Sequence, residues 1–398
     1  MKVQERFLHY VSFDTQSDAS SHTTPSTKKQ LALANELVRE CQKMGFDEVV
    51  LSEYGIVYAT LYANDPAYPS LGFCAHMDTA SELSGANISP WILSGYDGRD
   101  IVYPDGSVCS PKEYPSLLRC IGDDLILTDG TTLLGGDDKA GIAIIMTAVE
   151  EMIRSGKKHG KIVVAFTPDE EIGRGVDHFD LSQFMVDYAY TVDGSRIDSV
   201  DYENFNAAMA QITIRGTSIH PGDAKDKMVN ASLLASEWIQ KMPKKQTPAH
   251  TENRQGFYHL LEMNGTCEKA TLTYLLRHHD QRKFLAQKDF IHALCEKMNQ
   301  QYPGRFTIHI QDQYLNMKDL MKDKKAVRRA KKAIKANGLE PVSIPTRGGT
   351  DGAMLTEKGC TCPNLGTGSY NHHGRFEFCS IQQMEKMVNI VQFLIELS

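Results

Sequence analysis

Four apolar segments of this chain run directly into acidic residues or a histidine, and this repeated layout limits the fold more than any other feature. They are FCAHMDTA (73–80), AFTPDEEIG (165–173), TVDG (191–194) and, after a turn-rich stretch, LLGGDDKAG (133–141). In open α/β sheets, ligands bind beyond the carboxyl ends of the strands. Unpaired acids at one sheet edge repel each other, and a multivalent cation removes that repulsion. The sequence therefore predicts a cation site at the edge of a sheet.

The first half of the chain alternates helical and strand patterns. Residues 28–44 place apolar side chains on one helical face, and Gly45 follows as a stop signal. The largely apolar segment 140–156 predicts a second helix that ends at Gly156, and the segments around 71–78, 161–171 and 188–194 predict strands. Such alternation favours an α/β fold, with a mostly parallel mixed sheet covered by helices on both faces.

From about Asn206 the pattern changes. Strand patterns at 207–216, 270–278 and 305–312 enclose helical patterns at 230–242 and 289–302. Two helices among several strands predict an inserted α+β domain of ferredoxin-like type. The chain then returns to α/β character, with a closing helix opened by Ser380 and Gln383 at the spacing of a capping box. We therefore expect a discontinuous catalytic domain (1–205 and 315–398) and an inserted lid domain (206–314).

The composition limits which partners the chain is expected to bind and in which cellular compartment it is expected to work. A net charge of −7 gives no basic face for nucleic acid. The first residues lack an apolar signal core, and no run approaches the ~18 apolar residues of a membrane helix. The nine cysteines are scattered, which is typical of reduced thiols. We expect a cytoplasmic protein that binds no membrane and acts on a small substrate; the sequence leaves a homodimer open.

Two of these strand ends each carry a pair of residues that are candidates for metal binding and catalysis. On an extended segment His76 and Asp78 point the same way, so His76 can bind a metal while Asp78 holds its other ring nitrogen. The alternative is a buried histidine beside a surface aspartate. Glu170 and Glu171 are adjacent and point in different directions, so one can bind metal while the other acts as a base. A bare glutamate pair is more often solvated surface.

The other candidates are weaker when each is read alone. Asp137 and Asp138 follow two glycines that allow a sharp turn close to a ligand, but they also fit an acidic cap of the next helix. Taken by itself, Asp193 is best interpreted as an aspartate in a turn. The pair His372 and His373 is by itself weak evidence.

Taken together and in order, these segments resemble the co-catalytic di-zinc exopeptidases, a family that includes glutamate carboxypeptidases and aminoacylases. The resemblance runs from about residue 70 to the C-terminus. Its motifs are AHMDT, LLGGDDKAGIA, TPDEEIGRG, TVDG, SIHPGDAK, RGGTDGA and CPNLGTGSYNHHGRFEF. Their joint order and spacing are specific, although no single motif is decisive.

The resemblance implies a role for each matching residue. Two zinc ions are expected per chain: His76 and Asp193 bind the first, Glu171 and His373 bind the second, and Asp137 bridges both. His373 rather than His372 fits the Asn-x-His-Gly pattern of the family. Asp78 orients His76, and Glu170 is the general base and acid. The family also predicts a cis peptide bond after the bridging aspartate, between Asp137 and Asp138.

Three further candidates are His220 and Arg277 in the inserted domain and Arg347 in the segment that follows it. The resemblance implies that His220 stabilises the tetrahedral oxyanion, although a turn histidine before Pro221 is the alternative. Arg277 and Arg347 are candidates for binding the substrate carboxylate with two hydrogen bonds each. The expected function is zinc-dependent removal of the N-terminal residue from tripeptides. The alternatives are a related dipeptidase, aminoacylase or desuccinylase and, from another class, a non-catalytic metal-stabilised binding protein.

Overall fold

The computed structural model describes residues 1–397 of the chain and divides into two compact units. Unit 1 comprises 1–202, 321–344 and 350–398, and unit 2 comprises 203–320 and 345–349. Unit 2 is thus an insertion whose short second segment carries Arg347. Each unit has its own hydrophobic core.

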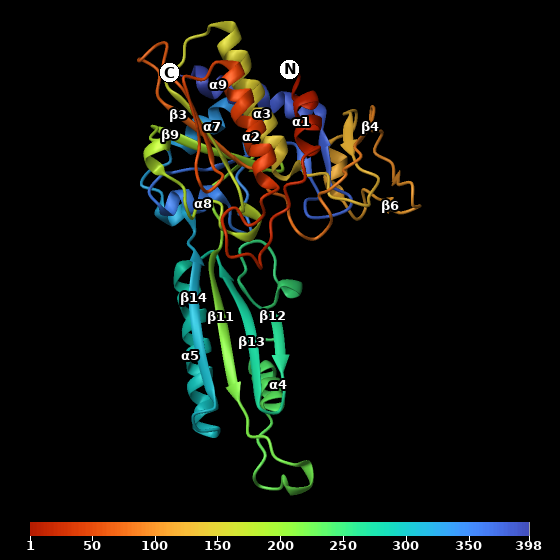
Figure 1. Ribbon diagram of the computed structural model, residues 1–398, viewed down its shortest axis with the longest axis vertical. Helices are drawn as coiled ribbons and strands as arrows, with labels where there is room; N and C mark the ends of the chain where they lie inside the picture. Colours follow the sequence, from red (N-terminus) through yellow and green to blue (C-terminus); the bar gives the residue numbers. More distant parts are fainter. Residues whose placement is uncertain (398) are drawn as a thin grey trace. The chain divides into compact units, whose positions relative to one another are not determined.

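A seven-stranded mixed sheet forms the centre of unit 1 (Figure 1). The four central strands are parallel, and the outer strands pair antiparallel. In spatial order the strands are β1 (Glu48–Leu51), β2 (Val57–Leu61), β8 (Ile162–Thr167), β3 (Leu71–His76), β9 (Tyr188–Gly194), β15 (Asn364–Gly366) and β10 (Val200–Asp201).

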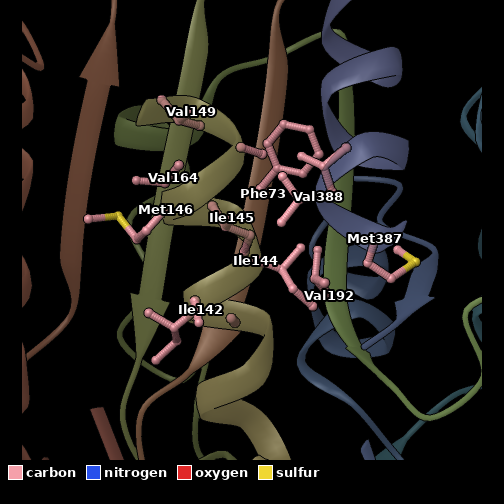
Figure 2. Packing of buried hydrophobic residues seen from close by; sticks show 14 of the residues in the cluster. Phe73, Ile142, Ile144, Ile145, Met146, Val149, Val164, Val192, Met387 and Val388 are labelled. Atoms are coloured by element: carbon pink, nitrogen blue, oxygen red, sulfur yellow. The ribbon is translucent and has the colours of Figure 1, made fainter. Parts of the chain in front are cut away.

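Helices cover this sheet on both faces, as the sequence predicts. One face packs against α1 (Val3–Val11), α2 (Gln30–Met44), α3 (Gly136–Ser155), α7 (Lys325–Ala336) and α9 (Ile381–Glu396). Figure 2 shows α3 with Ile145 and Val149 against Phe73 and Val164 of the sheet. The opposite face buries Cys74 and Val163 with α8 (Asp351–Glu357) and the short helix η3 (Leu181–Phe184). Neighbouring strand residues therefore point to opposite cores.

Glycines end the two helices where the sequence predicts. Gly45 after α2 and Gly156 after α3 are both left-handed, with φ of 93° and 64°. Such residues satisfy the last carbonyl groups of a helix without strain on a Cβ atom. At α9 the side chain of Ser380 accepts a hydrogen bond from the Gln383 amide, which is half of the predicted capping box.

A second, smaller sheet of unit 1 combines segments from distant parts of the chain. Its strands are β16 (Ser369–Tyr370), β17 (Phe378–Ser380), β7 (Leu125–Leu127) and β4 (Trp91–Leu93), and β5 (Ile101–Val102) pairs with β6 (Val108–Cys109) beside it. The short helix η1 (Pro115–Arg119) belongs to the same region. Tyr96, Tyr103 and Phe378 are buried in its core.

Unit 2 has a four-stranded antiparallel sheet with two helices on one face. The chain order is β11 (Asn206–Arg215), α4 (Ala231–Lys241), β12 (Phe257–Gly265), β13 (Lys269–His278), α5 (Gln281–Gln301) and β14 (Phe306–Tyr314). The spatial order β12-β13-β11-β14 is that of a ferredoxin-like βαββαβ unit. Trp238 of α4 and Phe284 of α5 are buried against the sheet. The structure thus confirms the predicted α/β class with its α+β insertion.

No helix among residues 1–397 combines the length and apolar character needed to cross a bilayer.

Candidate active site

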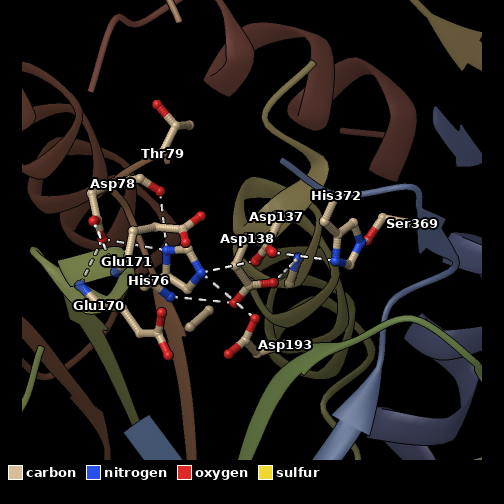
Figure 3. Close-up of polar contacts among 12 residues, drawn as sticks. His76, Asp78, Thr79, Asp137, Asp138, Glu170, Glu171, Asp193, Ser369 and His372 are labelled. Carbon is tan, nitrogen blue, oxygen red and sulfur yellow. Dashed lines mark hydrogen bonds and ion pairs between the residues drawn. The ribbon is translucent and has the colours of Figure 1, made fainter. Parts of the chain in front are cut away.

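The parallel strands of unit 1 bring the predicted site residues to one edge of the central sheet (Figure 3). His76, the last residue of β3, lies in register with Thr167, the last residue of β8. On the other side of β3, Cys74 pairs with Thr191, so that Asp193 of β9 lies at the same edge. The strand ends that the sequence singles out therefore converge because their strands are parallel neighbours.

Asp78 contacts one nitrogen of the His76 ring, Nδ1, so that the other nitrogen, Nε2, faces acidic side chains. Its Nδ1 lies 3.0 Å from the carbonyl oxygen of Asp78 and 3.3 Å from Oδ1 of the same residue. Two acceptors at Nδ1 place the ring proton there. Nε2 then presents its lone pair to Oδ1 of Asp137 at 2.9 Å and to Oδ1 of Asp193 at 3.6 Å. A lone pair that faces two carboxylates needs a proton or a cation between them.

Asp137 lies at the start of α3, where the backbone of Asp137 and Asp138 departs from helical geometry. Gly135 has φ of 78°, a conformation that favours glycine. The peptide bond between Asp137 and Asp138 is cis, as the resemblance predicts. One oxygen of Asp137 faces His76, and the other lies 3.2 Å from Nδ1 of His372 and 3.5 Å from Nε2 of His373. Asp137 thus lies between histidines on its two sides.

Glu170 and Glu171 follow β8 in the short helix η2 (Glu170–Ile172). Their backbone amides donate to Oδ1 and Oδ2 of Asp78 at 2.9 Å and 3.2 Å. Their side chains leave the turn in different directions, as Figure 3 shows. Oε2 of Glu171 lies 2.8 Å from Nε2 of His373. Its other oxygen, Oε1, is buried without a hydrogen-bond partner among residues 1–397.

These contacts form two groups of donor atoms that share one residue. In each group the donor atoms lie within 4.8 Å of one another. The groups are His76, Asp137 and Asp193, and Asp137, Glu171 and His373. Mixed imidazole and carboxylate donors fit a divalent cation such as zinc. The unpaired oxygen of Glu171 and the lone pair of His76 both fit such ions.

The pKa values of the site residues also fit bound cations. Burial raises the pKa of Glu171 to about 7 and that of Asp193 to about 6. Burial also raises the pKa of Glu170 well above its usual range. Hydrogen bonds to Asp137 and Glu171 raise the pKa of His373 to about 11. The acids gather where water stabilises their charge poorly, so they require positive charge close by, from protonated histidines or from metal ions.

The structure adds positioning contacts for two carboxylates: Glu377, which sequence reasoning does not single out, and Asp138, to which the resemblance assigns no role of its own. Glu377 accepts hydrogen bonds from the amides of Leu134, Gly135 and Asp137 at 2.8–3.0 Å, which fixes the turn that presents Asp137. Asp138 accepts from the amides of His76 and Gly141, both at 3.2 Å, and so ties β3 to α3. Glu377 lies in the GRFEF motif, but nothing in the sequence distinguishes it from a surface acid.

His372 is the neighbour that the family pattern sets aside, yet it also contacts Asp137. Its Nε2 lies 2.8 Å from Oγ of Ser369. Although burial lowers the pKa of His372, the Asp137 carboxylate raises it to about 9. His372 therefore contacts the shared carboxylate but belongs to neither donor group.

The three remaining candidates all lie in unit 2. His220 is exposed, and its Nδ1 accepts a hydrogen bond from the Gly222 amide. Arg277 is buried, lies over the ring of Tyr314 and donates to the carbonyl groups of Ala208 and Leu276.

Arg347 is held by the loop that precedes β12. It donates to the carbonyl groups of Asn253 and Gln255 at 3.0 Å and 3.1 Å. Its guanidinium also lies over the rings of Phe205 and Phe257. These contacts fasten the loop to the segment 345–349.

Comparison with known proteins places this site in a family. The family model described as peptidase family M20/M25/M40 matches residues 135–397. Peptidase T of Clostridium perfringens (strain ATCC 13124) is 47% identical over 400 residues, which cover 100% of this chain and 98% of that protein.

Two solved structures share the fold. The aminopeptidase PepT of Bacillus cereus has a TM-score of 0.78 at 22% identity, over 99% of this chain and 97% of that one. A tripeptidase of Staphylococcus aureus has a TM-score of 0.78 at 20% identity, with the same coverage. The chain is therefore a metallo-exopeptidase that belongs to peptidase family M20/M25/M40, with peptidase T among its relatives.

Proposed function

We propose that this chain removes the N-terminal residue from tripeptides and that two zinc ions take part. The observation that carries the proposal is the pair of donor groups that share Asp137, with Glu170 beside them and in neither group. The similarity to peptidase T over the whole chain and to structures described as an aminopeptidase and a tripeptidase supports the peptide substrate.

In this proposal His76 and Asp193 would hold one ion, Glu171 and His373 would hold the second, and Asp137 would contribute to both sites. Two divalent ions, when bound, supply Lewis-acid activation of a water molecule and of the scissile carbonyl group. Imidazole and carboxylate donors both suit zinc. Asp78 fixes the tautomer of His76, so that Nε2 stays free for a metal.

Glu170 is the proposed general base and acid. Its carboxylate accepts a proton from the attacking water and then delivers that proton to the leaving nitrogen as the peptide bond breaks. The turn fixes its backbone through Asp78, while its carboxylate belongs to neither donor group. Burial raises the pKa of the Glu170 carboxyl, which favours both acceptance and return of a proton.

The proposal also includes residues that contact the two ends of the substrate. The acids of the site favour a cationic amino terminus. His220 is proposed to stabilise the oxyanion, and Arg277 and Arg347 are proposed to bind the carboxylate. For Arg347 this requires that its guanidinium leave the carbonyl groups of Asn253 and Gln255. The unit 2 insertion is the proposed lid domain. The nine free cysteines support a reducing cytoplasm.

A panel of matched peptides tests this function. A free tripeptide is compared with its N-acetylated form, its C-terminal amide, and the dipeptide and tetrapeptide of the same series, with products identified by mass spectrometry. We expect cleavage at the first peptide bond. A lost charged hydrogen bond is worth ~1.5–3 kcal/mol, so each blocked end should lower kcat/KM by about one to two decades.

Metal dependence forms the second arm of this test. Dialysis against a chelator should abolish cleavage, and zinc should restore it. If the N-acetylated tripeptide is cut as fast as the free one, the aminopeptidase function is wrong and a related aminoacylase takes its place. If the dipeptide is the better substrate, the function is that of a dipeptidase.

A further inference from the structure

The turn between β8 and Glu170 has an unusual backbone that a distant segment holds in place. Asp169, directly before the proposed general base, is left-handed with φ of 59° and ψ of 22°. Few non-glycine residues adopt this conformation, although aspartate is among those that tolerate it best. Asp169 is fully buried. The surrounding contacts must therefore stabilise both its backbone and its charge.

Ser26 and Gln30 supply those contacts from the loop before α2 and from the first residue of α2. The amide of Ser26 donates to Oδ2 of Asp169 at 2.7 Å, and its hydroxyl group donates to Oδ1 at 2.5 Å. Nε2 of Gln30 donates to Oδ1 at 2.7 Å. In the opposite direction, the amide of Asp169 donates to Oε1 of Gln30 at 3.2 Å. Ser26 and Gln30 are both buried.

The same turn is held from its other side by Asp78. Asp78 accepts hydrogen bonds from the amides of Glu170 and Glu171. Three consecutive amides, those of residues 169 to 171, therefore each donate to a buried side chain. This arrangement leaves the backbone of Glu170 little freedom, and the direction of its side chain follows from its backbone.

We propose that Ser26, Gln30 and Asp169 are positioning residues that fix where the carboxylates of Glu170 and Glu171 lie. The inference rests on the proposed function, in which Glu170 transfers the proton and Glu171 binds a metal. Hydrolysis requires the base to lie within hydrogen-bond reach of the attacking water, and a displacement of about 1 Å can cost ~10²-fold in rate. Loosening the turn should thus affect turnover more than substrate binding.

Two single substitutions test this claim in the full chain. Ser26→Ala removes one hydroxyl donor and keeps the amide donor, and Gln30→Leu removes the other side-chain contact independently. Ser26→Thr keeps the hydroxyl group. Ser20→Ala is the matched control, because Ser20 lies in the same loop, is exposed and, within residues 1–397, forms its hydrogen bonds with Asp18 alone. If either test variant fails to fold, the other still decides the claim.

Kinetics and a metal spectrum are measured on each variant. We expect Ser26→Ala and Gln30→Leu each to lower kcat about 10-fold with KM within about twofold, in keeping with partial misplacement of the base. Ser26→Thr should recover most of the loss. The visible spectrum of the cobalt-loaded protein, which reports the surroundings of Glu171 without any turnover, should change in Ser26→Ala and in Gln30→Leu and stay unchanged in Ser20→Ala.

The outcomes separate this inference from the proposed function. If the wild-type chain cleaves none of the peptides, the proposed function is wrong, and the cobalt spectra still decide whether Ser26 and Gln30 position Glu171. If the wild type is active and both test variants match Ser20→Ala in kcat and in spectrum while only their melting temperatures fall, the contacts are merely structural and the inference is overturned.

Discussion

Nε2 of His373 lies 2.8 Å from Oε2 of Glu171, so the loop that carries His373 contacts the turn that follows β8. The neighbouring residue, Glu170, lies in the same turn but outside both donor groups. The proposed function gives these two adjacent glutamates different tasks, and substitution can separate those tasks.

Glu170→Gln and Glu171→Gln should therefore fail in different ways. Glu170→Gln should retain fold and metal but lose turnover by ~10²–10⁴-fold, the usual contribution of general acid–base catalysis. Glu171→Gln should lower the affinity for one of two ions, because an amide is a weaker ligand than a carboxylate. Activity and metal content are measured on both variants, and each serves as the control of the other. Near wild-type kcat in Glu170→Gln would remove it from the mechanism.

Gly141 should tolerate no side chain. A Cβ atom at this position would lie 1.9 Å from the carbonyl oxygen of Val192 and 2.5 Å from Oδ1 of Asp138. Because Val192 precedes Asp193, Gly141→Ala should push α3 away from the strand end that carries a proposed ligand. We expect a loss of about 3 kcal/mol or more in the free energy of unfolding, at the upper end of overpacking costs, together with reduced metal content.

Urea denaturation and metal analysis check the Gly141→Ala prediction. Gly348→Ala is the control, because a Cβ atom there meets nothing within 4 Å. Equal midpoints for the two variants would show that α3 and β9 can separate without cost.

Arg6 should stabilise the helical layer of unit 1. This fully buried guanidinium lies 2.7 Å from Oε1 of Glu40 and 3.0 Å from Oε2 of Glu150, and it donates to Thr147 at 2.7 Å. Arg6→Met leaves Glu40 without its cation, while Oε2 of Glu150 keeps the N-terminal ammonium group at 2.8 Å. We expect a cost of about 2–4 kcal/mol, since both glutamates are partly exposed. Arg39→Met, which removes an exposed cation, should cost under ~1 kcal/mol. Chemical denaturation compares the two variants.

Glu203 gives unit 2 a predicted dependence on pH. Hydrogen bonds from Arg254, followed by Lys318, lower the pKa of Glu203 to about 2. Since the folded-state pKa lies below the unfolded value near 4.5, the stabilisation is complete above the unfolded value and is lost as the pH falls through about 2. The melting difference between wild type and Glu203→Gln should therefore shrink between pH 4.5 and pH 2. A constant difference would contradict this, and Glu262→Gln, an exposed site, is the control.

The elements predicted well from sequence are those whose stability is largely local or whose strands are buried on both faces. The strands β3, β8 and β9 read as apolar runs because both of their faces are covered. The strands β4 and β7 of the smaller sheet cannot be predicted in this way, because each has only three residues and forms by pairing with its neighbours, β7 with β17 and β4 with β7. Such strands carry too little pattern to be recognised alone.

The residues of the site also divide into those that the sequence predicts and those that only the structure reveals. Acids at the ends of apolar strands were found because parallel strands place their ends together. Glu377, Ser26 and Gln30 were not found, because each acts through backbone amides or through one buried carboxylate that the sequence does not mark. Arg347 is the opposite case: the sequence motif marks it as a candidate for substrate binding, but in the structure its guanidinium donates to a loop of its own unit.

Asp137 belongs to both donor groups, and the number of ions bound per chain reports on that sharing. The purified chain is saturated with zinc, passed through a desalting column and measured by mass spectrometry, beside Asp137→Ala and His76→Ala. We expect two ions per wild-type chain, about one in His76→Ala and fewer than one in Asp137→Ala, because Asp137 belongs to both donor groups. A wild-type value that stays near one, or an Asp137→Ala variant that keeps two, would contradict this expectation.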